Sequence, residues 1–205
     1  MSINIKYLNN VGSNTTANLV LFSNEKYSLN NLKKYFSNSE FSYVSDLLKT
    51  SDLKKNMYVF EVNSKKKIVL ISIKKNLKNS DIENLGAELY GRINYGKNCE
   101  YTINADSIIN KDKSFIGHFL HGLKLKSYEF NKYKSKKDTR LITINVFGNK
   151  NKPSSSNQLK FKALEEGTFY ARDLVSEPGN VLHPDEYAKR LNSLKKDGLK
   201  INIYD

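Results

Sequence analysis

Short apolar runs of strand length recur along the chain, and the segments between them space their apolar residues as helices do. This alternation is typical of α/β folds, because each helix buries one face against the sheet that the strands form. The run at 140–147, which ends at Gly148, gives the clearest strand pattern in the sequence. The first part of the chain is therefore predicted to form a sheet flanked by helices, with 140–147 as its last strand.

Local signals refine the predicted elements. Residues 63–66, Asn-Ser-Lys-Lys, are predicted to join two strands as a hairpin, and 79–81, Asn-Ser-Asp, offer side chains suited to a helix N-cap. Phe115, Phe119 and Leu123 recur at helical spacing, which we interpret as core packing. The predicted strands are 3–7, 18–22, 58–62, 68–73, 101–104 and 140–147, and the predicted helices are two short ones within 29–48, one over 79–93 and one around 115–123.

A polar stretch at 149–157, rich in asparagine, lysine and serine, divides the sequence. Its composition is typical of a linker. We predict an N-terminal α/β domain over 1–148, a linker over 149–157 and a second unit over 158–205. The second unit is predicted to hold an amphipathic helix over 158–176, a helix over 184–196 that stops at Asp197-Gly198, and a strand over 199–204.

The formal net charge of +13 suggests a polyanionic partner. Only four of the 34 basic residues are arginines, although arginine is the residue that reads guanine edges and grips phosphate in a bidentate fork. The lysines are scattered, so we interpret most of them as solvated surface. The densest basic run, 132–137, is interleaved with aromatic residues, and a basic nucleic-acid-binding module therefore stays an alternative function.

No stretch approaches the ~18 consecutive apolar residues of a membrane span, and the first residues lack the apolar core of a signal peptide. The single cysteine, Cys99, cannot form an internal disulfide, which fits a reducing compartment. We therefore expect a soluble cytoplasmic protein without a membrane partner.

Two histidines are the first candidates for a metal site. His118 and His121 lie three residues apart on a predicted helix, where they could offer two ligands on one face. Zinc takes three or four ligands, and only Asp112 and Glu129 lie nearby in the sequence. We therefore interpret the two histidines as structural.

The remaining candidates lack partners in the sequence. Cys99 and the serine run 154–156 have no histidine beside them to act as a base, and His183 is interpreted as a surface residue at the start of a helix. No catalytic, cofactor-binding or metal-binding residue is assigned from the sequence.

A spaced pattern of glycine, leucine and aromatic residues lies within 116–137. It closely resembles the helix that closes the N-terminal domain of leucyl aminopeptidases. The resemblance implies that the aromatic residues anchor this helix in the domain core while the lysines between them point to solvent. The matching residues are Gly122, Leu125, Tyr128, Phe130, Tyr133 and Lys134.

The segment 171–184, Ala-Arg-Asp-Leu-Val-Ser-Glu-Pro-Gly-Asn-Val-Leu-His-Pro, is a more specific match to the same family. It departs from the family pattern at Ser176, which is usually asparagine, and at His183, which is usually threonine. Its residue types also have a structural meaning, because Pro178 ends the preceding helix and Pro184 suits the first turn of the next. Gly179 and Asn180 are predicted to turn the chain between them.

The resemblance to leucyl aminopeptidases implies a metal-dependent exopeptidase that removes N-terminal residues, leucine preferred, from peptides. Two divalent ions, manganese or zinc, activate the attacking water in such enzymes. The segments that hold these ions in the family do not occur in this sequence. The resemblance thus implies a macro-domain-like N-terminal domain, a connecting helix and the start of a catalytic domain, with roles in domain packing and in a homo-hexamer, and with no metal bound to this chain.

Overall fold

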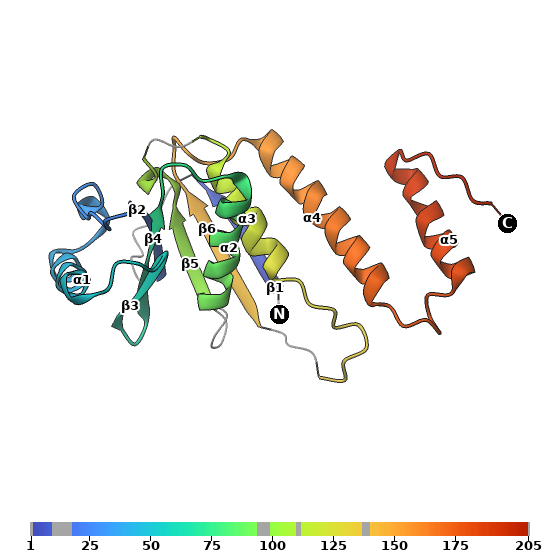
Figure 1. The fold of residues 1–205 in the computed structure, drawn as a ribbon, viewed down its shortest axis with the longest axis horizontal. Coiled ribbons are helices and arrows are strands. Elements are labelled where there is room, and N and C mark those ends of the chain that lie inside the picture. The colour runs from blue at the N-terminus through green and yellow to red at the C-terminus, as the bar shows by residue number, and fades with distance from the viewer. Residues whose placement is uncertain (1, 10–17, 94–98, 110–111, 137–139, 205) are drawn as a thin grey trace.

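A six-stranded mixed sheet forms the centre of the computed structural model, which describes residues 2–9, 18–93, 99–109, 112–136 and 140–204 (Figure 1). The strand order is β1-β6-β5-β2-β4-β3. All neighbours are parallel except β3 and β4, which form the predicted antiparallel hairpin. The strands are β1 (Ser2–Leu8), β2 (Asn18–Asn24), β3 (Met57–Asn63), β4 (Lys66–Ile73), β5 (Cys99–Asn104) and β6 (Leu141–Phe147).

Helices cover both faces of this sheet. One core lies between the sheet and α2 and α3, and a second lies between the opposite face and α1. The central strands β2 and β4 are therefore buried on both faces, which explains their nearly continuous apolar runs. The helices are α1 (Asn38–Thr50), α2 (Asn79–Ile93), α3 (Phe115–Lys126), α4 (Ser155–Ser176) and α5 (Pro184–Asn192). The predicted α/β class and its flanked sheet are confirmed.

Two glycines let α2 and α3 approach closely. A Cβ atom on Gly86 would lie 1.9 Å from the carbonyl oxygen of Phe119, and one on Gly122 would lie 1.9 Å from that of Glu83. Each glycine therefore faces the backbone of the other helix. Gly122 thus has a packing reason for its place in the first motif.

The segment 29–36 differs from the prediction. We expected two short helices within 29–48, but only α1 is an α-helix, and its predecessor is a single 3₁₀ turn at Lys33–Tyr35. Leu29 and Leu32 are nevertheless buried. They are the two ends of a turn that precedes the 3₁₀ turn, in which the Leu32 N–H donates to the carbonyl of Leu29 at 2.9 Å.

The prediction for the aromatic residues of the first motif was wrong. α3 ends at Lys126, where the Ser127 N–H and hydroxyl both donate to the carbonyl of Lys124. Tyr128, Phe130 and Tyr133 therefore lie beyond the helix, and Tyr133 is 52% exposed. Their spacing of two and then three residues does not keep one helical face, so they do not fill the domain core.

The predicted linker is partly ordered by Asp106. Its carboxylate accepts backbone N–H bonds from Asn149 at 2.8 Å, Lys150 at 2.9 Å and Asn151 at 3.3 Å. Burial favours a higher pKa for Asp106, but these three donors hold it below its usual value. α4 also begins at Ser155, three residues before the predicted 158, because the Ser154 hydroxyl caps it. The domain boundary itself stays a prediction.

The second unit contains two corrections. The predicted helix over 184–196 is α5 followed by a 3₁₀ turn at Ser193–Asp197, and Gly198, with φ +88°, ends it as predicted. Residues 199–204 form no strand, because no described strand lies beside them to supply hydrogen bonds. Gly179 keeps a negative φ, so the turn after α4 uses bonds from Val181 and Leu182 to the carbonyl of Pro178 instead.

Lysines occupy part of the open edge at β1. The Lys124 ammonium donates to the carbonyl of Ile3 at 2.7 Å, and that of Lys152 donates to the carbonyl of Leu8 at 3.5 Å. Charged side chains on an edge strand oppose pairing with other strands. None of the helices in the described ranges combines the length and the apolar content that crossing a bilayer requires.

Candidate functional site

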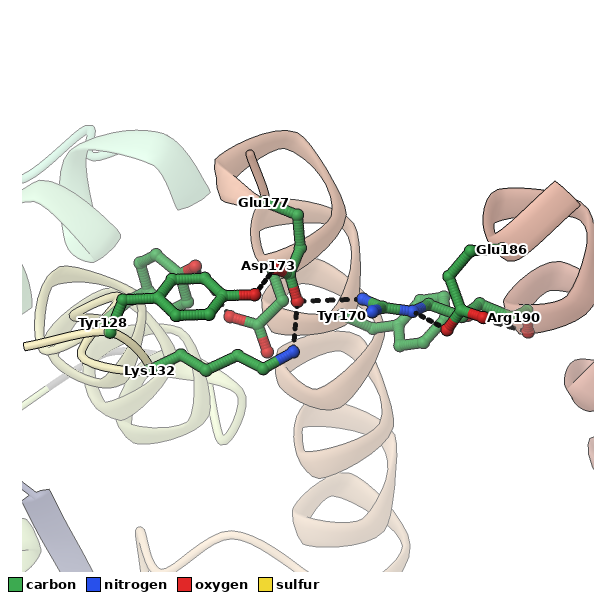
Figure 2. A network of polar contacts seen from close by, with 8 residues as sticks. Tyr128, Lys132, Tyr170, Asp173, Glu177, Glu186 and Arg190 are labelled. Atoms are coloured by element: carbon green, nitrogen blue, oxygen red, sulfur yellow. Dashed lines mark hydrogen bonds and ion pairs between the residues drawn. The ribbon is translucent and has the colours of Figure 1, made fainter. Parts of the chain in front are cut away.

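The two motifs lie far apart in sequence, but they meet in a polar joint between the segment after α3 and the end of α4 (Figure 2). α4 runs beside α3, and α5 lies on the side of α4 away from the sheet (Figure 1). We use "the joint" for the contacts of Tyr128, Lys132 and Tyr133 with Asp173, Glu177 and Arg190.

Phe161 docks the first half of α4 on α3. Its ring covers Gly117, where a Cβ atom would lie 2.2 Å from the ring, and its centroid lies 5.0 Å from that of His118 and 5.3 Å from that of His121. Phe161 is buried. Gly117 therefore leaves space for the Phe161 ring, and the imidazole rings of His118 and His121 form the sides of the socket that holds this ring.

Each histidine of this socket faces a carboxylate from another helix. His118 Nδ1 lies 2.8 Å from Glu83 Oε1 of α2, and His121 Nδ1 lies 3.4 Å from Glu165 Oε1 of α4. Within the described ranges, no three His, Cys, Asp or Glu side chains gather in a metal-binding arrangement. The described contacts of the histidine pair are thus the Phe161 ring and one carboxylate each, and its structural role stays a prediction.

Arg172 and Asp173 hold the start of the post-α3 segment. The Arg172 guanidinium donates to the carbonyl of Leu125 at 2.7 Å and lies over the ring of Tyr128, 5.4 Å from its centroid. The Tyr128 hydroxyl donates to Asp173 at 2.7 Å. Burial and this hydrogen bond raise the pKa of Tyr128, so the phenol stays a donor at neutral pH.

Glu177 is the centre of the joint. Its carboxylate accepts hydrogen bonds from Lys132 and Tyr133, and it forms an ion pair with the Arg190 guanidinium at 2.9 Å. Its side chain is 2% exposed because these partners cover it. Lys132, Tyr133 and Arg190 lower the pKa of Glu177 to about 2, against the opposing effect of burial. Glu177 therefore remains ionised throughout the physiological range.

Arg190 connects the joint to α5. Its Nε donates to Glu186 at 2.9 Å on the same helix, and its backbone carbonyl accepts from the Tyr170 hydroxyl at 2.9 Å. Two contacts therefore cross the turn between α4 and α5: the ion pair of Glu177 with Arg190 and the hydrogen bond of Tyr170 with the Arg190 carbonyl. Within the described chain, a cavity of about 500 Å³ lies at this junction, lined by Phe130, Tyr170 and Leu174 together with charged residues of the joint.

The chemistry of the joint favours binding within the chain over catalysis. Its carboxylates are already paired with cations or phenols, and an activated nucleophile needs a base that is free to accept its proton. The contacts of the joint tie the segment after α3 to the end of α4 and to α5.

The other sequence candidates lie apart from one another. Asp112 accepts from the backbone of Ser114 and interacts electrostatically with His118, and Glu129 accepts from Asn131. Cys99 is half-buried in β5, and Ser154 caps α4. His183 is exposed at the start of α5, 3.9 Å from Asp185.

The sequence analysis did not identify several residues through which α4 contacts α3 and α5. Phe161, Glu165 and Tyr170 read as ordinary members of an amphipathic helix, since nothing in sequence order links them to α3 or α5. Arg190 carried one usable signal, because Glu186 precedes it by four residues, the spacing of an intrahelical ion pair. Its bond to Glu177 depends on the turn between the helices.

Comparison with known proteins gives relatives but no matching family model. A probable cytosol aminopeptidase of Nitrobacter hamburgensis is 34% identical over 142 residues, which cover 63% of this chain and 27% of the relative. One of Ehrlichia ruminantium strain Gardel is 33% identical over 127 residues, covering 59% of this chain and 25% of the relative. The matched segment thus spans about a quarter of these curated relatives.

Solved structures share the fold across nearly the whole chain. A mutant of tomato leucine aminopeptidase matches with a TM-score of 0.68 and 15% identity, covering 96% of this chain and 42% of the other. Cytosol aminopeptidase from Coxiella burnetii matches with a TM-score of 0.62 and 15% identity, covering 93% and 37%. The resemblance to leucyl aminopeptidases that the two motifs predicted is confirmed by these relatives and folds.

Proposed function

We propose that this chain is the N-terminal portion of a cytosol aminopeptidase and that it holds the start of a catalytic domain in position. The joint carries the proposal. Residues matched to the family in two separate motifs, among them Tyr128, Tyr133, Asp173 and Glu177, contact one another directly. A positioning role explains why both motifs occur in a chain without a catalytic cluster in its described residues.

The proposed activity of the whole enzyme is the removal of N-terminal amino acids, leucine preferred, from peptides. Two divalent ions, manganese or zinc, would activate the attacking water. A bottromycin maturation enzyme that shares this fold with a TM-score of 0.65 was solved with Mn. The described side chains here do not fit such a centre, since no three potential ligands gather. We therefore assign the ions to residues outside this chain.

Exposed apolar side chains on the second unit support a role in packing and assembly. Leu164 is 48% exposed and Val175 is 88% exposed on α4, and Tyr204 after α5 is 87% exposed. Contact with another protein surface would remove these side chains from water. We propose that the catalytic domain and neighbouring subunits of a homo-hexamer cover it, and that the enzyme acts in the cytoplasm, as its relatives' names indicate.

A chimeric enzyme tests the positioning role. This chain would replace the matching N-terminal segment of the Nitrobacter hamburgensis relative, with hydrolysis of leucine p-nitroanilide and sedimentation as readouts. We expect an active hexamer, and at least a tenfold loss of activity on Glu177→Ala, because a displacement of catalytic groups by about 1 Å can cost ~100-fold in rate. Glu166→Ala, at an exposed residue of the same helix, is the control. A soluble but inactive chimera, or a fully active Glu177→Ala variant, contradicts the proposal.

The isolated chain tests the assignment of the metal site. We expect no hydrolysis of leucine amides by the purified 205-residue chain with manganese or zinc added. Turnover above a metal-only blank, in a preparation free of host peptidases, would show that this chain contains a metal site of its own.

A nucleic-acid-binding module is the second candidate, favoured by the net charge of +13. In the basic run, Lys134 and Lys136 are exposed, while Lys132 is engaged by Glu177, and Lys137 lies outside the described residues. Lys132 is itself 51% exposed, so the described run offers three exposed lysines, one of them paired with a carboxylate, which is a small footprint for binding a polyanion.

A further inference from the structure

A second cavity lies at the carboxyl ends of the central parallel strands, and none of its described lining residues belongs to the joint. After β2 the chain passes to α1 on one face of the sheet, whereas after β4 and β5 it passes to α2 and α3 on the other face. Because β2 lies between β4 and β5, its connection diverges from those of both neighbours. In open α/β sheets, such a switch point leaves a crevice in which ligands bind.

The crevice holds a cavity of about 480 Å³, within the range of small-molecule sites. Its walls combine two kinds of surface. Leu32, Ile73 and Ile109 supply apolar area, while Lys74 and Lys75 supply positive charge. None of its described lining residues is acidic, and the nearby Glu25 carboxylate accepts the backbone N–H of Lys75 at 3.2 Å.

Ser107 connects the cavity lining to the buried residue Asn104. Ser107 lines the cavity, accepts the N–H of Phe22 at 3.0 Å, and donates to the carbonyl of Asn104 at 2.6 Å. Asn104 is fully buried at the end of β5, and its Nδ2 has no hydrogen-bond partner among the described residues. A buried amide without a partner is unusual and favours a polar guest or water nearby.

We propose that this cavity binds a small organic anion with an apolar body, its phosphate or carboxylate facing Lys74 and Lys75 and its body lying against Leu32, Ile73 and Ile109. The site thus makes two demands on the ligand: the lysines require an anionic group, and the apolar wall requires an apolar body. The proposal is independent of the aminopeptidase role, since none of these residues belongs to the joint.

Titration calorimetry of the 205-residue chain with four probes tests both demands. Phenyl phosphate and benzoate carry charge and body, inorganic phosphate carries charge only, and phenol carries the body only. We expect the first two to bind at least about tenfold more tightly than the other two. Phenyl phosphate and benzoate separate a phosphate from a carboxylate ligand. Equal affinity for inorganic phosphate and phenyl phosphate, or no binding of either organic anion at about 10 mM, overturns the proposal.

Charge-changing variants locate the binding. Lys74→Ala with Lys75→Ala is expected to weaken both organic anions at least about tenfold, whereas the exposed pair Lys195→Ala with Lys196→Ala leaves them within about twofold. Asn31→Asp places a negative charge on the cavity lining, and it is expected to weaken the anions without changing phenol binding. The neighbouring Asn30→Asp is its matched control. Equal effects of the two lysine pairs, or of the two asparagine changes, would assign the binding to general surface charge and overturn the proposal.

Discussion

Single residues set how closely the helices of this protein approach one another. Gly86 and Gly122 each face a backbone carbonyl across the α2–α3 contact, and Gly117 lies under the Phe161 ring. Backbone cannot move aside as a flexible side chain can. The cost of adding one methyl group therefore differs strongly among glycines of the same helices.

We predict that Gly122→Ala destabilises the protein by about 2–3 kcal/mol or more, because its Cβ would lie 1.9 Å from the carbonyl oxygen of Glu83. Gly91→Ala in α2 is the matched control, since no atom lies within 4 Å of its added Cβ. Alanine there should be neutral or stabilise by up to ~1 kcal/mol through helix propensity. Urea unfolding followed by circular dichroism measures both, and equal effects would refute the close α2–α3 contact.

Glu177 gives the joint a defined response to acid. Its pKa of about 2 in the folded protein lies below the ordinary 4.5, so its ionised form stabilises the joint above pH 4.5. This contribution is lost as the pH falls from 4.5 towards 2. We predict an NMR titration midpoint for the Glu177 carboxyl near pH 2, and a higher midpoint in Lys132→Ala, whose side chain provides the first of its hydrogen bonds. Lys134→Ala should not move the midpoint, and a wild-type value near 4.5 would contradict the joint.

At the scale of elements, apolar periodicity predicted the strands and long helices because burial on one or both faces sets that period. Apolar periodicity gave a wrong prediction where contacts between distant segments decide the local structure. Residues 199–204 alternate as a strand does, yet no described strand lies beside them, and the aromatic residues after Ser127 contact α4 instead of the core. The motifs located both halves of the joint. Their pairing through Asp173 and Glu177 could not be predicted, since sequence spacing carries no information about which segments meet.

The order in the first half of the predicted linker leads to a test by truncation. We predict that the N-terminal domain folds alone, and that fragment 1–152 is about 1–2 kcal/mol more stable than fragment 1–148. Only the longer fragment retains the three N–H groups that bind the Asp106 carboxylate. Urea unfolding of both fragments measures the difference. Asp106→Ala should reduce the difference without abolishing it, because the bonds of Asn151 to the carbonyls of Ala105 and Ile108 remain in the longer fragment. An unchanged difference would show that Asp106 does not order this segment.

At the scale of the whole molecule, the excess of lysine is spread over the surface more than it is gathered into one site. Several lysines have internal tasks, such as Lys66, which pairs with Glu40 at 2.6 Å, and Lys124, which binds the edge of β1. The net charge therefore overstates the positive surface that is available to a partner.

We predict that any DNA binding by this chain is weak, non-specific and sensitive to salt. A handful of phosphate contacts would lose about two or more powers of ten in affinity between about 50 and 200 mM salt through counterion release. Titration of two unrelated duplexes at both salt concentrations tests this. A sequence preference above about tenfold, or an affinity that survives the higher salt, would favour the nucleic-acid-binding module instead.

The pairing of β1 with β6 also constrains how the protein is made. β1 is the first strand in the chain, but its neighbour is the last strand of the sheet, with Ser2 opposite Leu141. During synthesis on the ribosome, β1 must wait without its partner until residue 147 has emerged, and closing so long a loop is slow. The nascent chain therefore exposes β1 without its partner strand until β6 has emerged, which makes this segment a natural target for chaperones that bind extended peptides.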